Sequence, residues 1–282
     1  MVIKSAFILP HGSMILNPSK EGIPGQIGPL HNAMRLVGDT IAKKKPDLIF
    51  LSTPHGIALD NDYGLYKNQS ARGTAEWDEE YGEYEVLVPL DQDITEQCYQ
   101  WLKKHAIPVS KITCFAQTVS IPLRWGEAVP IWFLKNTNTK YLIMSQPTRR
   151  YEQAKSMIPE LRQMGHLLAE FFQKMQKSIT VIISGDLAHT HMQEGPYGYS
   201  ETAEVFDALI QKWITSEGKN QTLLLEKAAE VLEEAMACGF TGFVLLQGIL
   251  EKITLKSKLL ASGHPTYYGM AVATYSIGGN GL

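Results

Sequence analysis

Two apolar stretches that each end in Pro-His-Gly constrain this chain more than any other feature. Residues 47–56 read DLIFLSTPHG, a strand-length apolar run that leads into His55. Residues 5–13 read SAFILPHGS, with His11 in the corresponding place. Ligand sites of α/β folds collect where parallel strands end, at one edge of the sheet. The repeated ending therefore predicts a pair of imidazoles at that edge.

The segment between these two stretches predicts a helix. Its apolar residues recur at the spacing of one helical face: Leu30, Met34, Val37 and Ile41. Pro46 then closes the helix. A strand, a helix and a second strand in this order predict a parallel, adjacent pair of strands, with both histidine loops at the same edge.

The rest of the chain continues to alternate between strand-like and helix-like segments. Further strands are predicted at residues 84–88, 112–115, 131–134, 141–144, 179–184, 254–260 and 266–276. Further helices are predicted at residues 94–105, 152–176, 201–215, 223–237 and 243–250. Because no Pro/Ser-rich linker or internal repeat interrupts this order, we expect one α/β domain over residues 1–282. Its central sheet should be mixed, largely parallel and flanked by helices.

Charge and composition exclude several classes of protein. The formal net charge is −3 and the only basic run is Lys43 to Lys45, which argues against a nucleic-acid surface. The three cysteines are widely spaced and include no CxxC pair, so neither a disulfide framework nor a zinc ribbon is indicated. No apolar run approaches the length that spans a membrane. We therefore expect a soluble, cytoplasmic protein with no nucleic-acid or membrane partner.

A long segment, residues 57–82, follows His55 and contains Tyr63, Tyr66, Trp77 and Tyr81. A loop of this length inside a compact domain is usually functional or holds unrecognised secondary structure. One hypothesis is an aromatic lid that excludes water and stacks on a ligand ring.

A third predicted strand, residues 179–184, also delivers histidine at its end, in the sequence GDLAHTH. Either His189 or His191 can be the functional member of this pair. Asp186 either caps the turn or forms a hydrogen bond to a histidine.

These histidines suggest a metal site. Neutral imidazole is the commonest metal ligand in proteins, and His11 and His55 can converge on one ion. A third, anionic ligand is then needed, and the sequence offers Cys238 or the carboxylates Glu233 and Glu234. Glu234 and Cys238 share a helix face if the helix continues between them. A lone cysteine at a helix boundary is, however, most often a small buried hydrophobic residue.

Taken together, these residues resemble the catalytic subunit of class III extradiol ring-cleavage dioxygenases, the LigB-like superfamily, which also contains the Memo proteins. The matching segments span nearly the whole chain: Pro10-His11, Lys45-Pro46-Asp47, Pro54-His55, residues 184–189, Cys238-Gly239, residues 248–250 and residues 267–270. Their order and spacing carry the resemblance.

The resemblance implies that His11 and His55 bind iron and that His189 is an acid-base residue beside the substrate. The dioxygenases supply a glutamate as the third ligand where this chain reads Ala237-Cys238-Gly239. Here the chain matches the Memo-like branch instead. A thiolate is a softer donor than a carboxylate and shifts preference towards zinc or copper, whereas Glu234 as ligand would restore the usual facial triad.

Three functions are compatible with this sequence. The first is an Fe(II)-dependent extradiol dioxygenase that inserts O2 into a catechol-type aromatic substrate. The second is a Memo-like metal- or partner-binding protein, with zinc or copper in the same pocket and no oxygenase activity. The third is a zinc hydrolase on a related scaffold. The sequence does not name the substrate, and it leaves a homo-oligomer or a partner subunit open.

Overall fold

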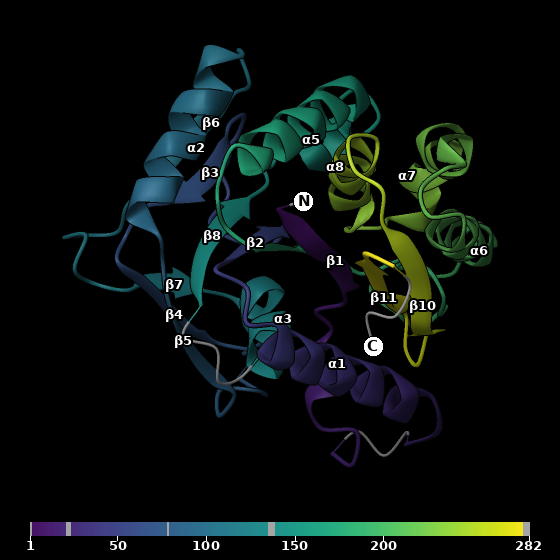
Figure 1. Cartoon of the computed structure of the whole chain (residues 1–282). Coiled ribbons are helices and arrows are strands. Elements are labelled where there is room, and N and C mark those ends of the chain that lie inside the picture. Colours follow the sequence, from purple (N-terminus) through teal and green to yellow (C-terminus); the bar gives the residue numbers. More distant parts are fainter. Residues whose placement is uncertain (1, 21–23, 78, 135–138, 279–282) are drawn as a thin grey trace.

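The computed structural model describes residues 2–20, 24–77, 79–134 and 139–278, and its core is an eight-stranded sheet (Figure 1). In spatial order its strands are β10 (Lys256–Gly263), β11 (Met270–Ser276), β1 (Ile3–Leu9), β9 (Ile179–Ser184), β2 (Leu48–Thr53), β8 (Lys140–Ser145), β3 (Tyr63–Tyr66) and β6 (Val109–Ile112). The central neighbours β1, β9, β2 and β8 are parallel. β11 pairs antiparallel with both β1 and β10, and β3 pairs antiparallel with β8. The predicted mixed, largely parallel α/β fold is confirmed.

The two strands that end in Pro-His-Gly run parallel, but they are not neighbours. β9 lies between β1 and β2 and pairs in parallel with both. The predicted common edge is therefore confirmed, whereas the predicted adjacency of β1 and β2 is wrong. All six residues of β9 are buried, as expected of a strand at the centre of a covered parallel sheet.

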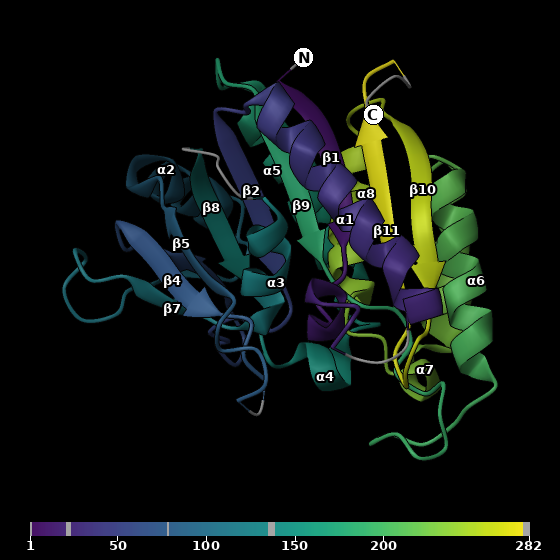
Figure 2. The same cartoon turned by 90° about the horizontal axis from the view of Figure 1, so that it is seen from below.

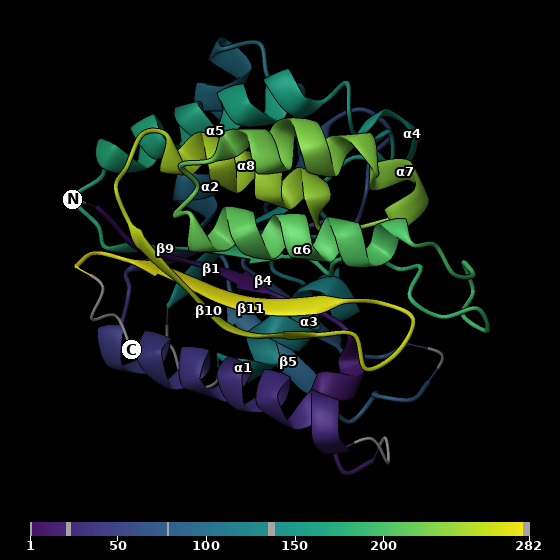
Figure 3. The same ribbon diagram turned by 90° about the vertical axis from the view of Figure 1, so that its right-hand side faces the viewer.

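Helices cover both faces of this sheet, so the molecule has three layers (Figure 3). One face carries α1 (Pro24–Lys44) and α3 (Trp125–Phe133). The other carries α2 (Gln92–Lys104), α5 (Ile158–Gln173), α6 (Thr202–Thr215) and α8 (Phe240–Leu250). Because side chains alternate along a strand, β2 serves both layers: Phe50 contacts Phe172 of α5, while Ile49 belongs to the cluster around α1.

The helix predicted between the first two strands is α1. Its predicted apolar residues are all buried: Leu30, Met34, Val37 and Ile41. Lys43 and Lys44 occupy its last turn, where positive charge favours the helix dipole. The chain leaves the helix at Lys45, which has a φ of 44°, directly before Pro46.

The long segment after His55 holds secondary structure that the sequence pattern did not reveal. β3 pairs with β8 and β6 in the large sheet. A second, three-stranded sheet has the order β5 (Glu85–Pro89), β4 (Ser70–Thr74) and β7 (Ile121–Leu123), and it lies beside β8 of the large sheet (Figure 2). β4 has the sequence SARGT, which lacks the apolar alternation that identifies a strand.

Two predicted strands are corrected by the structure. The prediction for residues 131–134 is wrong, because residues up to Phe133 belong to α3. Most of this helix is buried, so its short apolar run reads equally well as a buried strand. The prediction for residues 112–115 overlaps only the last residue of β6. Phe115 is exposed and has a φ of 50°, so the chain has already left the sheet there.

Two predicted helices are each divided. The region 152–176 contains α4 (Arg150–Gln153) and α5, and α5 begins with Pro159 in its first turn, where proline is tolerated. The region 223–237 contains a π-helical turn, η2 (Leu223–Ala228), and α7 (Leu232–Ala235). A short 3-10 helix, η1 (Ser13–Leu16), follows His11.

Within the described ranges, no helix combines the length and the apolar character that crossing a membrane requires.

Candidate metal centre

Three parallel strands end side by side and deliver the histidine loops to one place. Leu9 of β1 pairs with Ser184 of β9, and Ser52 of β2 pairs with Ile183. His11 and His55 follow their strands within three residues. Because this register aligns the strand ends, residues far apart in sequence meet at one edge of the sheet.

His11 is buried, and its hydrogen bonds define which ring nitrogen carries the proton. Ser184 Oγ donates its single proton to the carbonyl oxygen of Gly126 at 2.5 Å. Ser184 Oγ also lies 2.9 Å from His11 Nδ1. Because its own proton is already donated, Ser184 Oγ accepts the hydrogen bond from that nitrogen. His11 Nε2 therefore keeps its lone pair, and it lies 3.4 Å from Cys238 Sγ. An orienting bond of this kind is typical of metal-binding histidines.

Of the two roles considered for Asp186, the structure shows a hydrogen bond to a histidine, made to its backbone. One carboxylate oxygen accepts the backbone N–H of His11 at 3.0 Å, which holds the loop after β1. The other lies 3.4 Å from His11 Nε2. Burial raises the pKa of Asp186 to about 7. This carboxyl group therefore lies beside the histidine and thiol cluster and exchanges its proton near neutral pH.

His55 meets His11 edge to face, with ring centroids 4.9 Å apart. Burial lowers the pKa of His55 to about 3 and that of His11 well below its ordinary value. Both rings are therefore neutral at physiological pH, which is the form that binds metal. Gly56 follows, and a Cβ there would lie 2.5 Å from Tyr66 Oη and 2.6 Å from Glu127 Oε1, so only glycine fits.

Cys238 completes this group from the segment before α8. Its sulfur and one nitrogen each of His11 and His55 all lie within 4.8 Å of one another. Burial, followed by the charge of Asp186, raises the pKa of Cys238 to about 12, so metal binding would displace the thiol proton. Two imidazoles and a sulfur form a donor set that fits a transition-metal ion such as zinc, copper or iron.

Glu234 lies outside this group. α7 ends at Ala235, and Met236 has a φ of 54°, so the helix does not continue to Cys238 as a shared face would require. The Glu234 carboxylate is exposed, with one oxygen 3.4 Å from Ser200 Oγ. Glu233 is also exposed and pairs with Lys155 at 3.2 Å. Among the described residues, Cys238 is thus the candidate that the fold brings to His11 and His55.

His189, rather than His191, faces the cavity. The carbonyl oxygen of Leu187 accepts the Nδ1 proton of His189 at 3.0 Å, so the neutral ring has its lone pair on Nε2. Burial lowers the pKa of His189 to about 4. His191 is instead bonded to Asp207 at 3.0 Å and stacked on His264.

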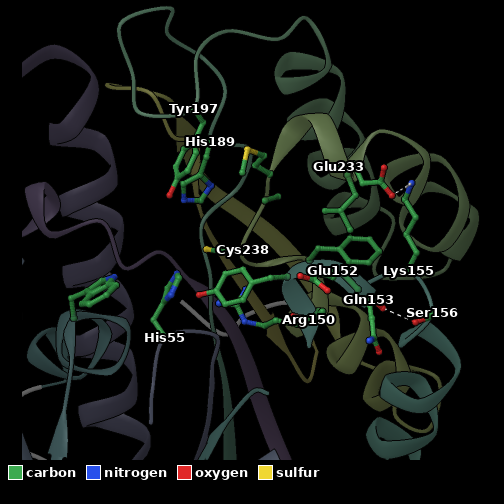
Figure 4. Close-up of a pocket in the computed structure, with 18 of the residues that line it drawn as sticks. His55, Arg150, Glu152, Gln153, Lys155, Ser156, His189, Tyr197, Glu233 and Cys238 are labelled. Carbon is green, nitrogen blue, oxygen red and sulfur yellow. Dashed lines mark hydrogen bonds and ion pairs between the residues drawn. The ribbon is translucent and has the colours of Figure 1, made fainter. Parts of the chain in front are cut away.

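Two cavities with shared lining residues, of about 500 and 250 Å³, open around these groups. Figure 4 shows His55 and His189 pointing from opposite sides towards Cys238, which lines the larger cavity. Both cavities are lined by His55, Trp77, Trp125, His189 and Tyr197. Of the predicted lid aromatics, Trp77 and Tyr81 line this space, whereas Tyr63 and Tyr66 are buried in β3.

Sequence reasoning missed two lining residues, Trp125 and Arg150. Trp125 begins α3, and the sequence pattern predicts a strand for the end of this helix. Arg150 begins α4, five residues after β8 ends at Ser145. The position of Arg150 in the sequence could have indicated its place at the cavity, because it follows β8, another parallel strand that ends at the same edge of the sheet.

The model of one protein family, the catalytic LigB subunit of aromatic ring-opening dioxygenase, matches residues 5–275. The chain belongs to this family. It is also 22% identical over 264 residues to Protein CA_C1420 of Clostridium acetobutylicum, a match that covers 93% of this chain and 55% of that protein. The chain therefore spans about half the length of that relative.

Among solved structures, the fold is similar to that of the uncharacterized protein JW3007 from Escherichia coli K12. The TM-score is 0.61 at 14% sequence identity, and the match covers 96% of this chain and 99% of that one. At this identity the likeness concerns the fold alone. The family membership supports a dioxygenase-like protein without naming its metal or its substrate.

Proposed function

We propose that this protein is an Fe(II)-dependent extradiol dioxygenase that opens a catechol-type aromatic ring with O2. The observation that carries the proposal is the convergence of His11, His55 and Cys238 at the wall of a cavity that also holds His189. We also propose that residues 1–282 form one LigB-like domain.

A metal ion bound by His11, His55 and Cys238 would supply open positions at which a catechol and dioxygen are activated. The protein's part is to hold the ligands before the metal arrives. Ser184 keeps the lone pair of His11 on Nε2, and Asp186 holds the backbone of the same loop. Ligands that are already oriented need little reorganisation on binding.

His189 is suited to move the proton of a bound catechol. With its proton on Nδ1, the neutral ring has its lone pair on Nε2, so it can accept a hydroxyl proton as the substrate binds and return it later. The carbonyl oxygens of Leu187 and Met236 favour the protonated ring, although burial has the larger effect on its pKa. Tyr268 stacks on the ring, with centroids 5.8 Å apart, and helps to fix its orientation.

Aromatic side chains would contact the substrate ring and exclude water. Trp77 and Trp125 contact each other edge to face at 4.3 Å, and Trp125 lies 5.3 Å from the His55 ring. Such walls favour a flat apolar ligand, and a drier cavity strengthens the electrostatic effect of His189.

A second function is favoured by one specific observation. Of the predicted third ligands, Cys238 lies with the two histidines, whereas Glu233 and Glu234 do not. Because sulfur is a softer donor than oxygen, this set suits zinc or copper better than the usual iron triad does. The alternative is therefore a Memo-like metal-binding protein without oxygenase activity.

Metal analysis combined with an activity assay separates the two. The protein is purified anaerobically, its metal content is measured, and Fe(II) is loaded into the metal-free form. A panel of catechols is then added with air, and the yellow ring-fission product is followed by absorbance. Ring fission supports the dioxygenase, whereas tightly held zinc or copper with no colour from any catechol would exclude it.

His189→Ala tests the assignment of roles in the same assay. If His189 handles protons and does not bind the metal, this variant keeps its metal and loses roughly 100-fold to 10,000-fold in turnover. Loss of the metal would show that His189 is a ligand. His191→Ala is the matched control, because that ring bonds to Asp207 and does not line the cavity.

A further inference from the structure

We propose that His191, Glu204 and His264 form a second metal site, which takes a divalent transition-metal ion such as zinc. The site lies outside both cavities, because none of these three residues lines either of them. The inference does not depend on the proposed function, since it uses none of the residues assigned to the candidate metal centre.

Three elements that are distant in sequence bring these side chains together. His191 lies in the segment between β9 and α6, Glu204 lies in the first turn of α6, and His264 directly follows β10. β10 runs antiparallel to β11, which runs antiparallel to β1, so β10 and β1 end at the same edge of the sheet. α6 lies beside β10 (Figure 2). This packing brings the turn after β10 to the first turn of α6.

The donor atoms of the group are spaced as metal ligands are. One nitrogen each of His191 and His264 and one carboxylate oxygen of Glu204 all lie within 4.8 Å of one another. Glu204 Oε1 is 3.1 Å from His264 Nε2 and 3.8 Å from His191 Nδ1. Ligand atoms bound to a tetrahedral zinc ion at about 2.0 to 2.1 Å are about 3.4 Å apart. An ion can therefore bind between these atoms after small side-chain movements.

Asp207 fixes the ring of His191. Its carboxylate lies 3.0 Å from His191 Nε2 and accepts the proton of that nitrogen. The other carboxylate oxygen accepts the backbone N–H of Ala188 at 3.0 Å, so Asp207 is itself held in place. With the proton on Nε2, the neutral ring has its lone pair on Nδ1, which faces Glu204. A histidine whose second nitrogen bonds to a carboxylate is typical of metal sites.

The rings of His191 and His264 stack face to face, with centroids 4.2 Å apart and an angle of 5° between their planes. An ion shared by both rings requires one of them to tilt, because the nitrogen lone pairs lie in the ring planes. His191 is buried and held by Asp207, whereas the side chain of His264 is 42% exposed. Exposed side chains change rotamer readily, so the ring of His264 is the one that can turn towards the ion.

The charges around the group also favour a cation. Glu204 and Asp207 are three residues apart on α6 and approach the two ring nitrogens of His191. In the described part of the chain, neither carboxylate pairs with a lysine or an arginine, and their basic partners are histidines. When these histidines are neutral, the two carboxylates carry negative charge that a divalent ion would balance.

The donor set selects the class of ion. Imidazole nitrogen suits zinc, copper and nickel, whereas calcium and magnesium take oxygen ligands. Two histidines and a glutamate also form the protein ligands of zinc sites that keep a fourth position open. The side chain of Glu204 is 62% exposed, so water can fill that position. The group therefore suits zinc better than a hard cation.

An ion at this place would fasten one wall of the smaller cavity. The turn that begins with His264 continues into Tyr267 and Tyr268, which line that cavity. The backbone N–H of His191 donates a hydrogen bond to the carbonyl oxygen of Tyr267 at 3.0 Å. Tyr268 in turn stacks on the ring of His189. Metal binding would therefore join α6 to the wall against which the His189 ring lies.

Cobalt titration of the metal-free protein tests the inference without turnover. Co(II) is added under nitrogen with a phosphine reductant, absorption is recorded, and bound metal is counted by mass spectrometry after desalting. We expect two equivalents in the unmodified protein. One should give the sulfur-to-cobalt charge-transfer band of Cys238, and the other should bind without adding to that band, because the second site contains no sulfur.

Variants of exposed residues assign the second equivalent. His264→Gln and Glu204→Gln should each lose the equivalent without the sulfur band and keep the band. Cys238→Ala should show the reverse. His166→Gln is the matched control, because His166 is also a partly exposed histidine paired with a glutamate, Glu251. Within the described ranges His166 belongs to no group of three donors, so this variant should keep both equivalents.

Three results would overturn the inference: a single equivalent with the sulfur band in the unmodified protein, two equivalents in both His264→Gln and Glu204→Gln, or an equal loss in His166→Gln. His191→Ala should likewise lose the second equivalent and keep the sulfur band, so its metal content is counted for each site separately. Circular dichroism checks that each variant is folded.

The same measurements separate this inference from the proposed function. Two equivalents assigned in this way, with no ring fission of any catechol, leave the second site in place and remove the dioxygenase. Ring fission by a protein that binds a single equivalent, with the sulfur band, retains the dioxygenase and removes the second site.

Discussion

Ser184 accepts the Nδ1 proton of His11 because its own hydroxyl proton is donated to the carbonyl oxygen of Gly126. This relationship joins β9 to the loop after β1 and leaves His11 Nε2 with a lone pair facing Cys238. The orientation of the candidate metal ligand thus depends on a hydroxyl group 173 residues away in the sequence.

Ser184→Ala should weaken metal binding without unfolding the protein. Removal of an orienting partner typically lowers metal affinity by roughly tenfold to hundredfold. The measurement is a competition titration of zinc against a chromophoric chelator. Ser5→Ala is the matched control, because Ser5 is also a buried strand serine but bonds to Thr180. Equal affinities for Ser184→Ala and the unmodified protein would refute the orienting role.

Cys238→Ala should weaken metal binding by more than Ser184→Ala does, because it removes a donor atom and not only its support. Glu234→Ala should leave the affinity unchanged, since its carboxylate is exposed and lies by Ser200. The metal content of each purified variant is measured together with its affinity. A loss of metal in Glu234→Ala with retention in Cys238→Ala would reverse the assignment.

Gly56→Ala should destabilise the protein and displace the His55 loop. The added Cβ would lie 2.5 Å from Tyr66 Oη and 2.6 Å from Glu127 Oε1, so one of these buried groups must move. Overpacking of this kind costs about 1 to 3 kcal/mol of unfolding free energy. Urea unfolding measures the cost, and metal titration measures the displacement.

Gly28→Ala is the matched control for this glycine. A Cβ at Gly28, in α1, meets no atom within 4 Å. Because Pro29 follows and disfavours a side chain in the helical conformation at residue 28, we expect a change of less than about 1 kcal/mol in unfolding free energy. A Gly56→Ala variant as stable as Gly28→Ala would show that the close contacts around Gly56 relax without cost.

Glu127 should make the metal-free protein less stable as pH rises. Burial raises the pKa of Glu127 from 4.5 to about 7, so between these values the folded state holds a proton that the unfolded state has released. Unfolding free energy therefore falls as pH rises through this window, by about 3 kcal/mol for this group alone, and does not change further above it.

The check is urea unfolding of the metal-free protein from pH 4.5 to 8, compared with Glu127→Gln. The variant cannot ionise, so its stability should fall less steeply over the same window. Gln can still accept the hydrogen bond from Tyr66, but its amide nitrogen cannot accept the one from the Arg124 backbone N–H, so the slopes and not the absolute stabilities are compared. Parallel curves for the two proteins would contradict the proposed ionisation.

Much of the candidate site was predictable because strand ends are local features. The apolar runs before His11, His55 and residues 184–189 identify three buried strands. In a parallel sheet the C-terminal ends of such strands lie at one edge. The family resemblance rests on the same segments. The short apolar run at 131–134 predicts a strand, but the structure has the end of α3 there. A short buried helix and a buried strand have the same local apolar pattern.

The α/β fold class and the histidines that reach the cavity edge could be predicted from the sequence, because both follow from local apolar patterns and strand order. Which of Cys238 and Glu234 lies near the two histidines depends on the tertiary structure, since a single left-handed residue, Met236, separates their directions. The tertiary structure also decided that Arg150 lies buried without an acidic partner among the described residues. Such relationships arise from packing between elements distant in sequence, which no local pattern encodes.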